Sequence, residues 1–311
     1  MQYADLTGHT AGKKGIIRMI DYTIFVDSSA DLEPLLLENH DIHIVGMHYT
    51  IGVEQCDCSV TESGAARKRF YDRQRNGEVC HTSQAVPQQF IDAFAPALES
   101  GRNVLYLSLS GGLTNMHNSI YLAKMELSEH YPNTHVYEFD SLSATGGIGL
   151  LAEIAVKNRD EGMSIEENVA KLEEMRARLC HLFMVEDLIY LKRGGRIPAA
   201  TAVIGTALSM KPILVIDEEG KLRVVDKKRG HKAAIGSMLE RYSQTKDDRY
   251  QRISIVHADA PILAHQLAEE LAKRNPQAHI SEGMLSPIIG AHTGPGMAAI
   301  IYFGDRSEIA H

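Results

Sequence analysis

Three polar stretches, two of which contain glycine, offer the residue types that bind an anionic group. The first, Ile288–Gly296, packs three glycines, a proline, a histidine and a threonine into nine positions. The other two, His81–Gln84 and Ser108–Gly112, lie far upstream in the chain. Hydroxyls and free backbone N–H groups suit a carboxylate or a phosphate better than a metal ion. We therefore expect the three stretches to meet at one anion-binding site.

Two of these stretches also have a purely structural interpretation. Ser110 and Gly111 follow an apolar strand and precede a helix, so the hydroxyl and N–H groups either hold an anion or cap that helix. Thr82 and Ser83 stand just ahead of a helix that Pro87 can open at its first turn. Binding and capping both remain open for these four residues.

The third stretch places an imidazole and a hydroxyl between glycines. His292 is either a loop histidine satisfied by the backbone or a donor to an acidic head group, and Thr293 adds a second donor. A pairing of Ser110 as nucleophile with His292 as base can also be drawn. No acidic orienting residue is evident, and the chain has no Walker, Gly-x-Gly-x-x-Gly, His-Glu-x-x-His or Gly-x-Ser-x-Gly motif.

A basic segment, Lys192–Arg196, stands out in an acidic chain. It is either a salt-bridged helix end or a docking site for an acidic or phosphorylated partner. Cys56-Asp57-Cys58 lacks a second pair and the two-residue gap of zinc sites, so we expect no metal.

The composition indicates a globular protein of two lobes. The chain has 311 residues, 44% of them hydrophobic and 23% charged. A formal charge of −8 argues against nucleic acid as the main partner. No apolar run approaches the roughly 18 residues of a membrane span, and neither a signal peptide nor a disulfide framework is recognisable, so we expect a cytoplasmic protein without membrane insertion.

Short β-rich runs alternate with helical periodicity through the first half, which predicts a mainly parallel sheet. Residues 1–21 lack periodicity and are set aside as an extension. The expected strands are 22–26, 42–47, 104–108 and 135–139, and the expected helices begin near 31, 61, 87, 115 and 143. Ligands of such sheets lie beyond the carboxyl ends of the strands.

The pattern changes near Gly162, where Ser164–Glu167 forms a capping box for a charged helix. We therefore expect lobes at 22–163 and 164–311. The second lobe is predicted to contain strands 182–185, 213–217, 222–226, 253–257 and 298–303, with helices over 199–210, 230–242 and 261–274 and a short helix ending at Lys192–Arg196. The turn Glu218-Glu219-Gly220 predicts a hairpin.

Taken together, these segments resemble the DegV family of bacterial fatty-acid-binding proteins. The matching motifs, in chain order, are Asp27–Leu32, Thr82-Ser83-Gln84, Ser108–Gly111, Asp140-Ser141, Leu191–Ile197, Lys211–Leu214, Lys228-Arg229 and His292–Gly296. They cover nearly the whole chain, and their order and spacing are more specific than any one of them. Two positions depart from the family pattern: Ala85-Val86 replace a proline and a serine, and Gly112 replaces a threonine.

The resemblance implies a two-lobe α/β fold, a mainly parallel sheet with helices on both faces plus a second α/β domain. It implies that a long-chain fatty acid lies between the lobes and is handed to a separate ATP-dependent fatty acid kinase subunit, with no other cofactor and no metal. Carried over by position, the carboxylate-binding residues are Thr82, Ser83, Ser110, Gly111, His292 and Thr293, and the kinase-docking residues are Arg193 and Arg196.

Three hypotheses follow from these residues. The first is a carrier that performs no catalysis and presents the carboxyl group of its fatty acid to the kinase. The second is a serine hydrolase or acyl transferase that uses Ser110 and His292. The third, a module that binds a sugar or phosphate, requires a polar pocket where the first requires an apolar one.

Overall fold

The computed structural model describes residues 22–58, 63–198 and 209–311. Its strands are β1 (Tyr22–Asp27), β2 (Ile42–Val45), β3 (Met47–Ile51), β4 (Glu54–Cys58), β5 (Cys80–Ser83), β6 (Asn103–Ser108), β7 (Val136–Asp140), β8 (Leu179–Met184), β9 (Met210–Ile216), β10 (Leu222–Arg229), β11 (Arg252–His257), β12 (His279–Met284) and β13 (Ala298–Phe303). Its helices are α1 (Pro34–Asn39), α2 (Gly64–Arg75), α3 (Pro87–Glu99), α4 (His117–His130), α5 (Gly146–Asp160), α6 (Ile165–Arg176), α7 (Ile189–Arg193), α8 (His231–Thr245), α9 (Pro261–Arg274) and α10 (Pro287–Thr293), with a final 3₁₀ turn at Glu308–Ala310.

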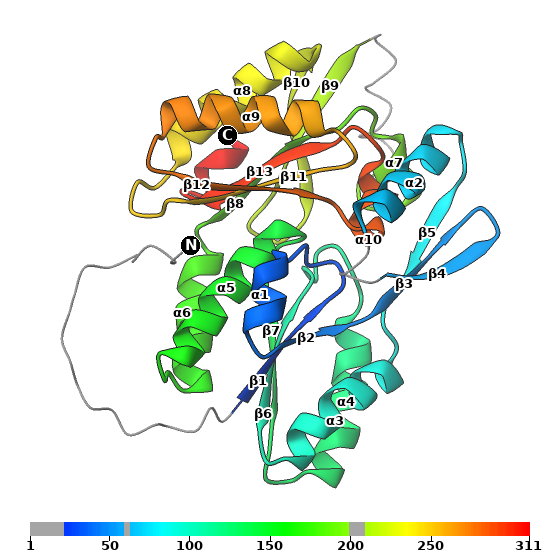
Figure 1. Cartoon of the computed structure of the whole chain (residues 1–311), viewed down its shortest axis with the longest axis vertical. Coiled ribbons are helices and arrows are strands. Elements are labelled where there is room, and N and C mark those ends of the chain that lie inside the picture. Colours follow the sequence, from blue (N-terminus) through cyan, green and yellow to red (C-terminus); the bar gives the residue numbers. More distant parts are fainter. Residues whose placement is uncertain (1–21, 59–62, 199–208) are drawn as a thin grey trace.

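The first lobe is built on a parallel sheet in the order β2-β1-β6-β7. Side chains of β1 alternate between its two faces. Phe25 packs against Phe94 of α3 with ring centroids 4.8 Å apart, whereas the Tyr22 hydroxyl accepts a hydrogen bond from Asn168 of α6. Helices therefore cover both faces of the sheet, as the resemblance to the DegV family implies (Figure 1).

A small antiparallel sheet, β4-β3-β5, projects from this lobe beside α2 (Figure 1). The sequence predicts one strand over 42–47, but the chain leaves the parallel sheet after Val45 and enters the small sheet at Met47. The prediction is wrong because Gly46 separates two strands of different sheets. The third strand of this small sheet, β5, contains Thr82 and Ser83, so these residues do not lie in a helix-capping loop.

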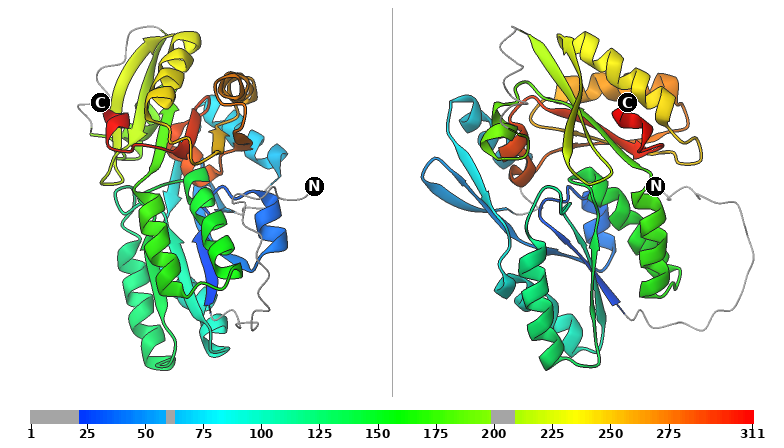
Figure 2. Two further views of the ribbon diagram at one scale, coloured as in Figure 1. Left: turned by 90° about the vertical axis from the view of Figure 1, so that its left-hand side faces the viewer. Right: turned by 180° about the vertical axis from the view of Figure 1, so that it is seen from behind.

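The second lobe contains a six-stranded sheet in the order β10-β9-β8-β13-β11-β12. All its strand pairs are antiparallel except β11 with β12. On β8, Cys180, Leu182 and Met184 pack in the core that α8 and α9 cover, whereas Phe183 belongs to the core shared with the first lobe. Figure 2 shows α8 and α9 over the outer face of this sheet, with the first lobe against the other side.

Most predicted elements agree with the structure to within a few residues, and α9 and β13 have the predicted bounds. The predicted hairpin is present, with Gly220 at a φ of 74° in its turn. Strands β4, β5 and β12 and helix α10 were not predicted from the sequence. Of the helix predicted over 199–210, residues 199–208 lie outside the described residues, and Met210 starts strand β9.

The connection between the lobes begins later than the sequence suggests. The predicted boundary at residue 164 precedes α6, but Asn168 of α6 donates to the Ala155 carbonyl of α5 and to Tyr22 of β1. Helix α6 therefore packs with the first lobe. The chain passes into the second sheet between Arg176 and Leu179.

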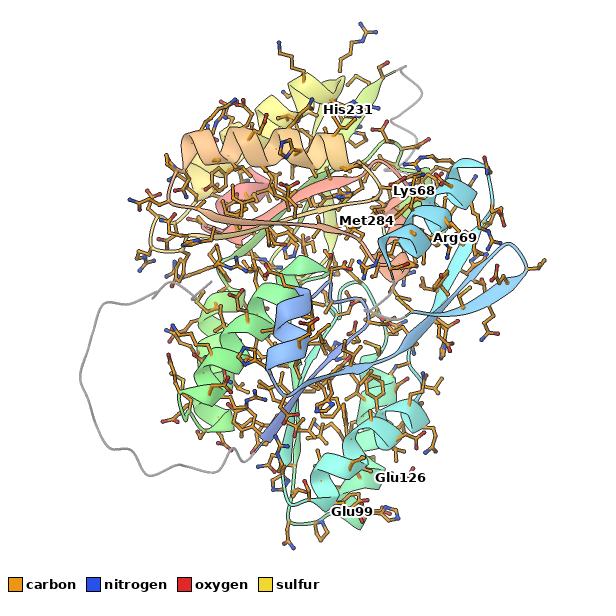
Figure 3. The ribbon with its side chains drawn as sticks, viewed as in Figure 1. Lys68, Arg69, Glu99, Glu126, His231 and Met284 are labelled. Atoms are coloured by element: carbon orange, nitrogen blue, oxygen red, sulfur yellow. The ribbon has the colours of Figure 1, made fainter. Side chains whose placement is uncertain are left out.

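Helix α2 reaches from the first lobe to the second. Arg67 of this helix pairs with Asp31 at 3.2 Å and donates to the Met284 carbonyl at the end of β12. Figure 3 shows Lys68 and Arg69 on α2 close to Met284. Because Arg67 and Asp31 are both largely buried, their pairing fixes α2 across the boundary between the lobes.

The carboxyl edge of the parallel sheet is organised by a buried carboxylate at the end of β1. Asp27 accepts hydrogen bonds from the Leu109 N–H at 2.9 Å and the Tyr106 hydroxyl at 3.0 Å. It also accepts the Ser29 N–H at 2.9 Å. These bonds hold the loops after β1 and β6 together, so the two loops lie at one edge as expected.

Among the described residues, no helix is long and apolar enough to cross a bilayer.

Asp27→Ala should lower the free energy of unfolding by about 3 kcal/mol, because it leaves several buried donors without an acceptor. Urea denaturation followed by circular dichroism measures this loss. The matched control is Asp57→Ala, which removes a carboxylate that is 87% exposed and should change stability by less than about 0.5 kcal/mol. Equal effects of the two substitutions would contradict this role of Asp27.

Candidate ligand-binding site

A cavity of about 710 Å³ lies between the two lobes. Its apolar wall is the face of the second sheet that α8 and α9 do not cover, together with side chains of β3, α7, α10 and the loop after β6. The apolar lining residues include Met47, Leu109, Leu113, Phe183, Leu191, Ile216, Leu222, Ile288, Ile289, Met297, Ala299 and Ile301. A volume in this range is typical of small-molecule sites that are mostly apolar with a few placed polar groups.

Five of the six predicted carboxylate-binding residues line this cavity. They are Thr82, Ser83, Gly111, His292 and Thr293. Thr82 Oγ1 and His292 Nε2 lie 2.8 Å apart, although the residues are 210 positions apart in the sequence. The structure therefore brings the upstream and downstream stretches to one polar cluster.

His292 and Thr293 form the end of a helix and do not lie in a loop. Helix α10 begins with Pro287 in its first turn and ends at Gly294, whose φ of 72° stops the helix. The Thr293 hydroxyl donates to the Ile289 carbonyl at 3.4 Å, one turn back. The sequence analysis interpreted the glycines as a tight loop and missed the helical turn before them.

His292 is held neutral. Burial, with a smaller contribution from the Arg196 cation, lowers its pKa from 6.5 to about 3. Its Nδ1 lies against the backbone of Gly194, where a Cβ atom would be only 2.1 Å away. Glycine at position 194 is thus required by the imidazole, and a neutral imidazole can donate to or accept from Thr82.

Ser110, the sixth predicted residue, is fully buried and is not among the residues that line the cavity. Its hydroxyl donates to the Gly220 carbonyl at 2.8 Å, across the boundary between the lobes. The neighbouring N–H groups are also occupied, since Gly111 donates to Asp140 at 3.2 Å and Gly112 to Ser110 Oγ at 3.1 Å. The expectation of free N–H groups in this loop is therefore wrong.

This geometry does not support the hydrolase hypothesis. His292 Nε2 is engaged by Thr82, and the Ser110 hydroxyl is engaged by Gly220, so the two residues do not form a nucleophile and base pair. In the described part of the chain, no carboxylate contacts His292 to orient it as a base.

A cluster of His117, Glu138 and Asp140 lies next to Gly111 and was not predicted from the sequence. His117 Nδ1 contacts Glu138, and its Nε2 lies 3.5 Å from Asp140, the carboxylate that accepts the Gly111 N–H. Hydrogen bonds to Asp140 and Glu138 raise the pKa of His117 to about 10. Burial opposes ionisation of Asp140, but bonds from His117 and two backbone N–H groups, including that of Gly111, outweigh it and lower its pKa. His117 lies on a helix that carries no sequence motif, so no local signal identified it.

The two predicted docking arginines have different environments. Arg193 is exposed and borders a surface depression with Arg75 and Tyr190. Arg196 instead lines the cavity, where its Nε donates to the Leu113 carbonyl at 3.1 Å. Burial lowers the pKa of Arg196, and no carboxylate of the described residues pairs with it. The cavity thus contains an uncompensated cation.

No group of three or more metal-ligating side chains occurs among the residues that the structure describes. All four cysteines fall within this part, and each is a free thiol. Cys56 and Cys58 both lie on β4 of the small sheet.

The buried imidazole makes stability depend on pH. Between a folded pKa of about 3 and the usual 6.5, the unfolded chain protonates His292 and the folded chain does not, so stability falls as pH falls. The His292→Gln variant should therefore take up about one proton fewer than the wild-type protein when it unfolds near pH ~5. Urea denaturation over a pH series measures the difference, and equal slopes for the two proteins would contradict a neutral His292.

Comparisons with known proteins identify the family of this chain. A family model described as "Uncharacterised protein, DegV family" matches residues 21–305. The DegV domain-containing protein YteA of Lactococcus lactis is 34% identical over 287 residues, which are 92% of this chain and 99% of the relative. A DegV domain-containing protein of Clostridium perfringens is also 34% identical and covers 93% of this chain and 100% of its own length.

Solved structures show the same fold. A DegV family protein from Thermus thermophilus, described by its fatty acid binding, superposes with a TM-score of 0.81 at 27% identity and covers 91% of this chain and 99% of its own. DegV from Bacillus subtilis, described as a fatty acid binding protein, gives a TM-score of 0.78 at 27% identity with the same coverage. With a family match over most of the chain and relatives above 30% identity, this chain belongs to the DegV family.

Proposed function

We propose that the protein binds a long-chain fatty acid in the cavity between its lobes and presents the carboxyl group to an ATP-dependent fatty acid kinase subunit. The observation that carries this proposal is the cavity itself, which joins an apolar sheet face to a cluster of hydroxyl, imidazole and guanidinium groups. The Thermus thermophilus and Bacillus subtilis structures, whose descriptions name fatty acid binding, support it.

The polar cluster accounts for binding of a carboxylate. If the neutral His292 donates from Nε2 to Thr82 Oγ1, the Thr82 hydroxyl proton is free to donate to the ligand. Ser83 and Thr293 lie beside this pair, and Arg196 supplies a positive charge without a partner among the described carboxylates. A carboxylate left without such donors in a buried site would be strongly disfavoured.

The apolar wall accounts for binding of the tail. Burying a methylene group is worth about 0.8 kcal/mol, so a long acyl chain gains on the order of 10 kcal/mol before the costs of association. Phe183, Ala299 and Ile301 of the second sheet line the cavity from the face that its own helices do not cover. A sugar or phosphate ligand would leave this face without an apolar partner.

Ser110 and Gly111 support the site from behind in this arrangement. Gly111 lines the cavity, and the Ser110 hydroxyl is within the same loop. The hydrogen bonds that hold this loop, to Asp27, Asp140 and Gly220, are all made without a ligand. Direct contact of Ser110 with the carboxylate requires its hydroxyl to leave Gly220, and it stays a prediction.

The kinase partner in this proposal comes from the resemblance to the DegV family. Handing the acid to a kinase requires a surface near the carboxyl end, and exposed Arg193 lies on the helix that adjoins the cavity wall at Leu191. We place the protein in the reducing cytoplasm, in keeping with its free thiols, and expect no nucleic acid partner from its charge of −8.

Protein purified from bacteria should carry a fatty acid, detectable by native mass spectrometry and by analysis of the extracted lipid. The double variant Thr82→Ala, Ser110→Ala should stay folded and lose this ligand, because it removes the Thr82 hydroxyl from the polar cluster and the Ser110 hydroxyl that holds the loop beside it. Thr50→Ala is the matched control, since Thr50 lies on neighbouring strand β3 and is not among the cavity-lining residues. Wild-type protein that is consistently empty and binds no added fatty acid would overturn the proposed function.

Arg193→Glu should leave fatty acid affinity unchanged and slow phosphorylation of the bound acid about tenfold at limiting kinase, because it places a repulsive charge on the docking surface. The measurement is the initial rate of acyl phosphate formation with ATP and a purified kinase subunit. Arg249→Glu reverses another exposed charge, far along the sequence in the second lobe, and should have little effect. Equal rates of acyl phosphate formation for the two variants would show that Arg193 does not take part in docking the kinase.

A further inference from the structure

One face of helix α2 donates hydrogen bonds to the backbone of the second lobe. Three side chains of this face each donate to a carbonyl of the chain between the end of β12 and the middle of α10: Arg67 donates to Met284, the Tyr71 hydroxyl to Leu285 at 3.1 Å, and Gln74 Nε2 to Gly290 at 3.3 Å. Spacings of four and three residues place these donors on the same side of a helix. Helix α2 of the first lobe therefore holds the segment of the second lobe that carries His292.

The position of α10 depends on such contacts with its neighbours. With seven residues, α10 is shorter than the roughly 12–15 residues below which an isolated helix is only marginally stable in water. The two donors from α2 that reach α10 and the residue before it are well buried, since Tyr71 is 0% and Gln74 is 2% exposed. A Cβ atom on Gly290 would lie 2.2 Å from the Tyr71 hydroxyl oxygen, so the glycine lets α10 approach α2 directly.

The same helix also holds the small sheet that carries Thr82. Phe70 of α2 packs edge-on against Tyr49 of β3, with ring centroids 5.3 Å apart. Tyr49 in turn lies opposite Thr82 where β3 pairs with β5. Figure 1 shows α2 next to both the small sheet and α10. The two residues of the Thr82–His292 contact come from different lobes, and both are held in place through α2.

We infer that Tyr71 and Gln74 are positioning residues for the carboxylate site, because they hold α10 where His292 meets Thr82. This inference rests on the proposed function and adds two residues to it that do not line the cavity. A hydrogen bond weakens steeply as its distance and angle depart from the optimum, so a small shift of α10 would break the 2.8 Å contact between Thr82 Oγ1 and His292 Nε2. The Thr82 hydroxyl would then lose the partner that directs its proton to the ligand.

The test is a double-mutant cycle on the delipidated full chain, in which displacement of a fluorescent fatty acid gives the affinity for palmitate. The first change is the paired variant Tyr71→Phe, Gln74→Met, which nearly keeps the size of both side chains and removes their hydrogen bonds to the α10 segment. The second change is Thr82→Ala. We expect the paired variant to bind palmitate about tenfold more weakly than the wild-type protein. Thr82→Ala should weaken binding much less in the paired variant than in the wild-type protein, because the contact with His292 is already lost.

Tyr22→Phe is the matched control. Tyr22 is likewise a buried tyrosine of the first lobe whose hydroxyl donates to a backbone carbonyl, that of Met163 at 3.3 Å, and it does not line the cavity. This variant should lose stability in urea denaturation and keep its affinity for palmitate. A loss of affinity as large as that of the paired variant would mean that any buried hydroxyl matters equally, and would contradict a positioning role of Tyr71 and Gln74.

The titration of His292 gives a second measurement. Burial lowers the pKa of this imidazole to about 3 in the wild-type protein. If α10 moves away from α2 in the paired variant, water reaches the imidazole and its pKa should rise toward 6.5, whereas Tyr22→Phe should leave it unchanged. NMR of the imidazole over a pH series measures the pKa, and a value that stays at about 3 in the paired variant would contradict the inference.

If the paired variant does not fold, Gln74→Met alone takes its place in the cycle and should likewise reduce the effect of Thr82→Ala. Equal affinity of the wild-type protein and the paired variant for palmitate would overturn the positioning role and leave the proposed function intact. A Thr82→Ala effect of the same size in both backgrounds would do the same, because the two changes would then act independently. Wild-type protein that binds no fatty acid overturns the proposed function and this inference together.

Discussion

The second sheet carries helices on one face only, and its other face must be buried by something else. Cys180, Leu182 and Met184 are covered by α8 and α9, while Phe183 and Ile301 face the first lobe. The loops of the first lobe cover part of this face and leave a cavity over the rest. Since burial of apolar surface is the main favourable term in folding and binding, an acyl tail is the natural complement of the remaining area. The two-lobe arrangement and the ligand site follow from the same uncovered face.

Placement of the polar groups depends on a different kind of contact. Asp27 and Asp140, at the carboxyl ends of two parallel strands, accept backbone N–H groups of the loop that follows β6. The Leu109 and Gly111 N–H groups are therefore already hydrogen-bonded and are not available to an anion. Under the proposed function, recognition of the carboxylate would therefore fall to side chains, in particular the hydroxyl of Thr82 and the guanidinium of Arg196.

Much of the fold and part of the site could be predicted from the sequence. Strand and helix periodicity predicted the parallel sheet. The glycine-rich stretch pointed to His292 because it places an imidazole and a hydroxyl where glycines let the backbone approach a ligand. The occupied N–H of Gly111 could not be foreseen, because its partner Asp140 is 29 residues away and is itself held by His117. Helix α10 was missed because its seven residues are followed by glycines that dominate the local pattern, although Pro287 is a recognisable start signal.

The contact between Ser110 and Gly220 has a mechanical consequence. The tip of the β9–β10 hairpin lies so close to the loop after β6 that a Cβ atom on Gly112 would be 2.6 Å from the Gly220 carbonyl oxygen. The hairpin thus packs directly on the loop that contains Ser110 and is hydrogen-bonded to it. Because the Ser110–Gly220 hydrogen bond joins the two lobes, any separation of the hairpin from this loop has to break it and leave the Ser110 hydroxyl without its acceptor.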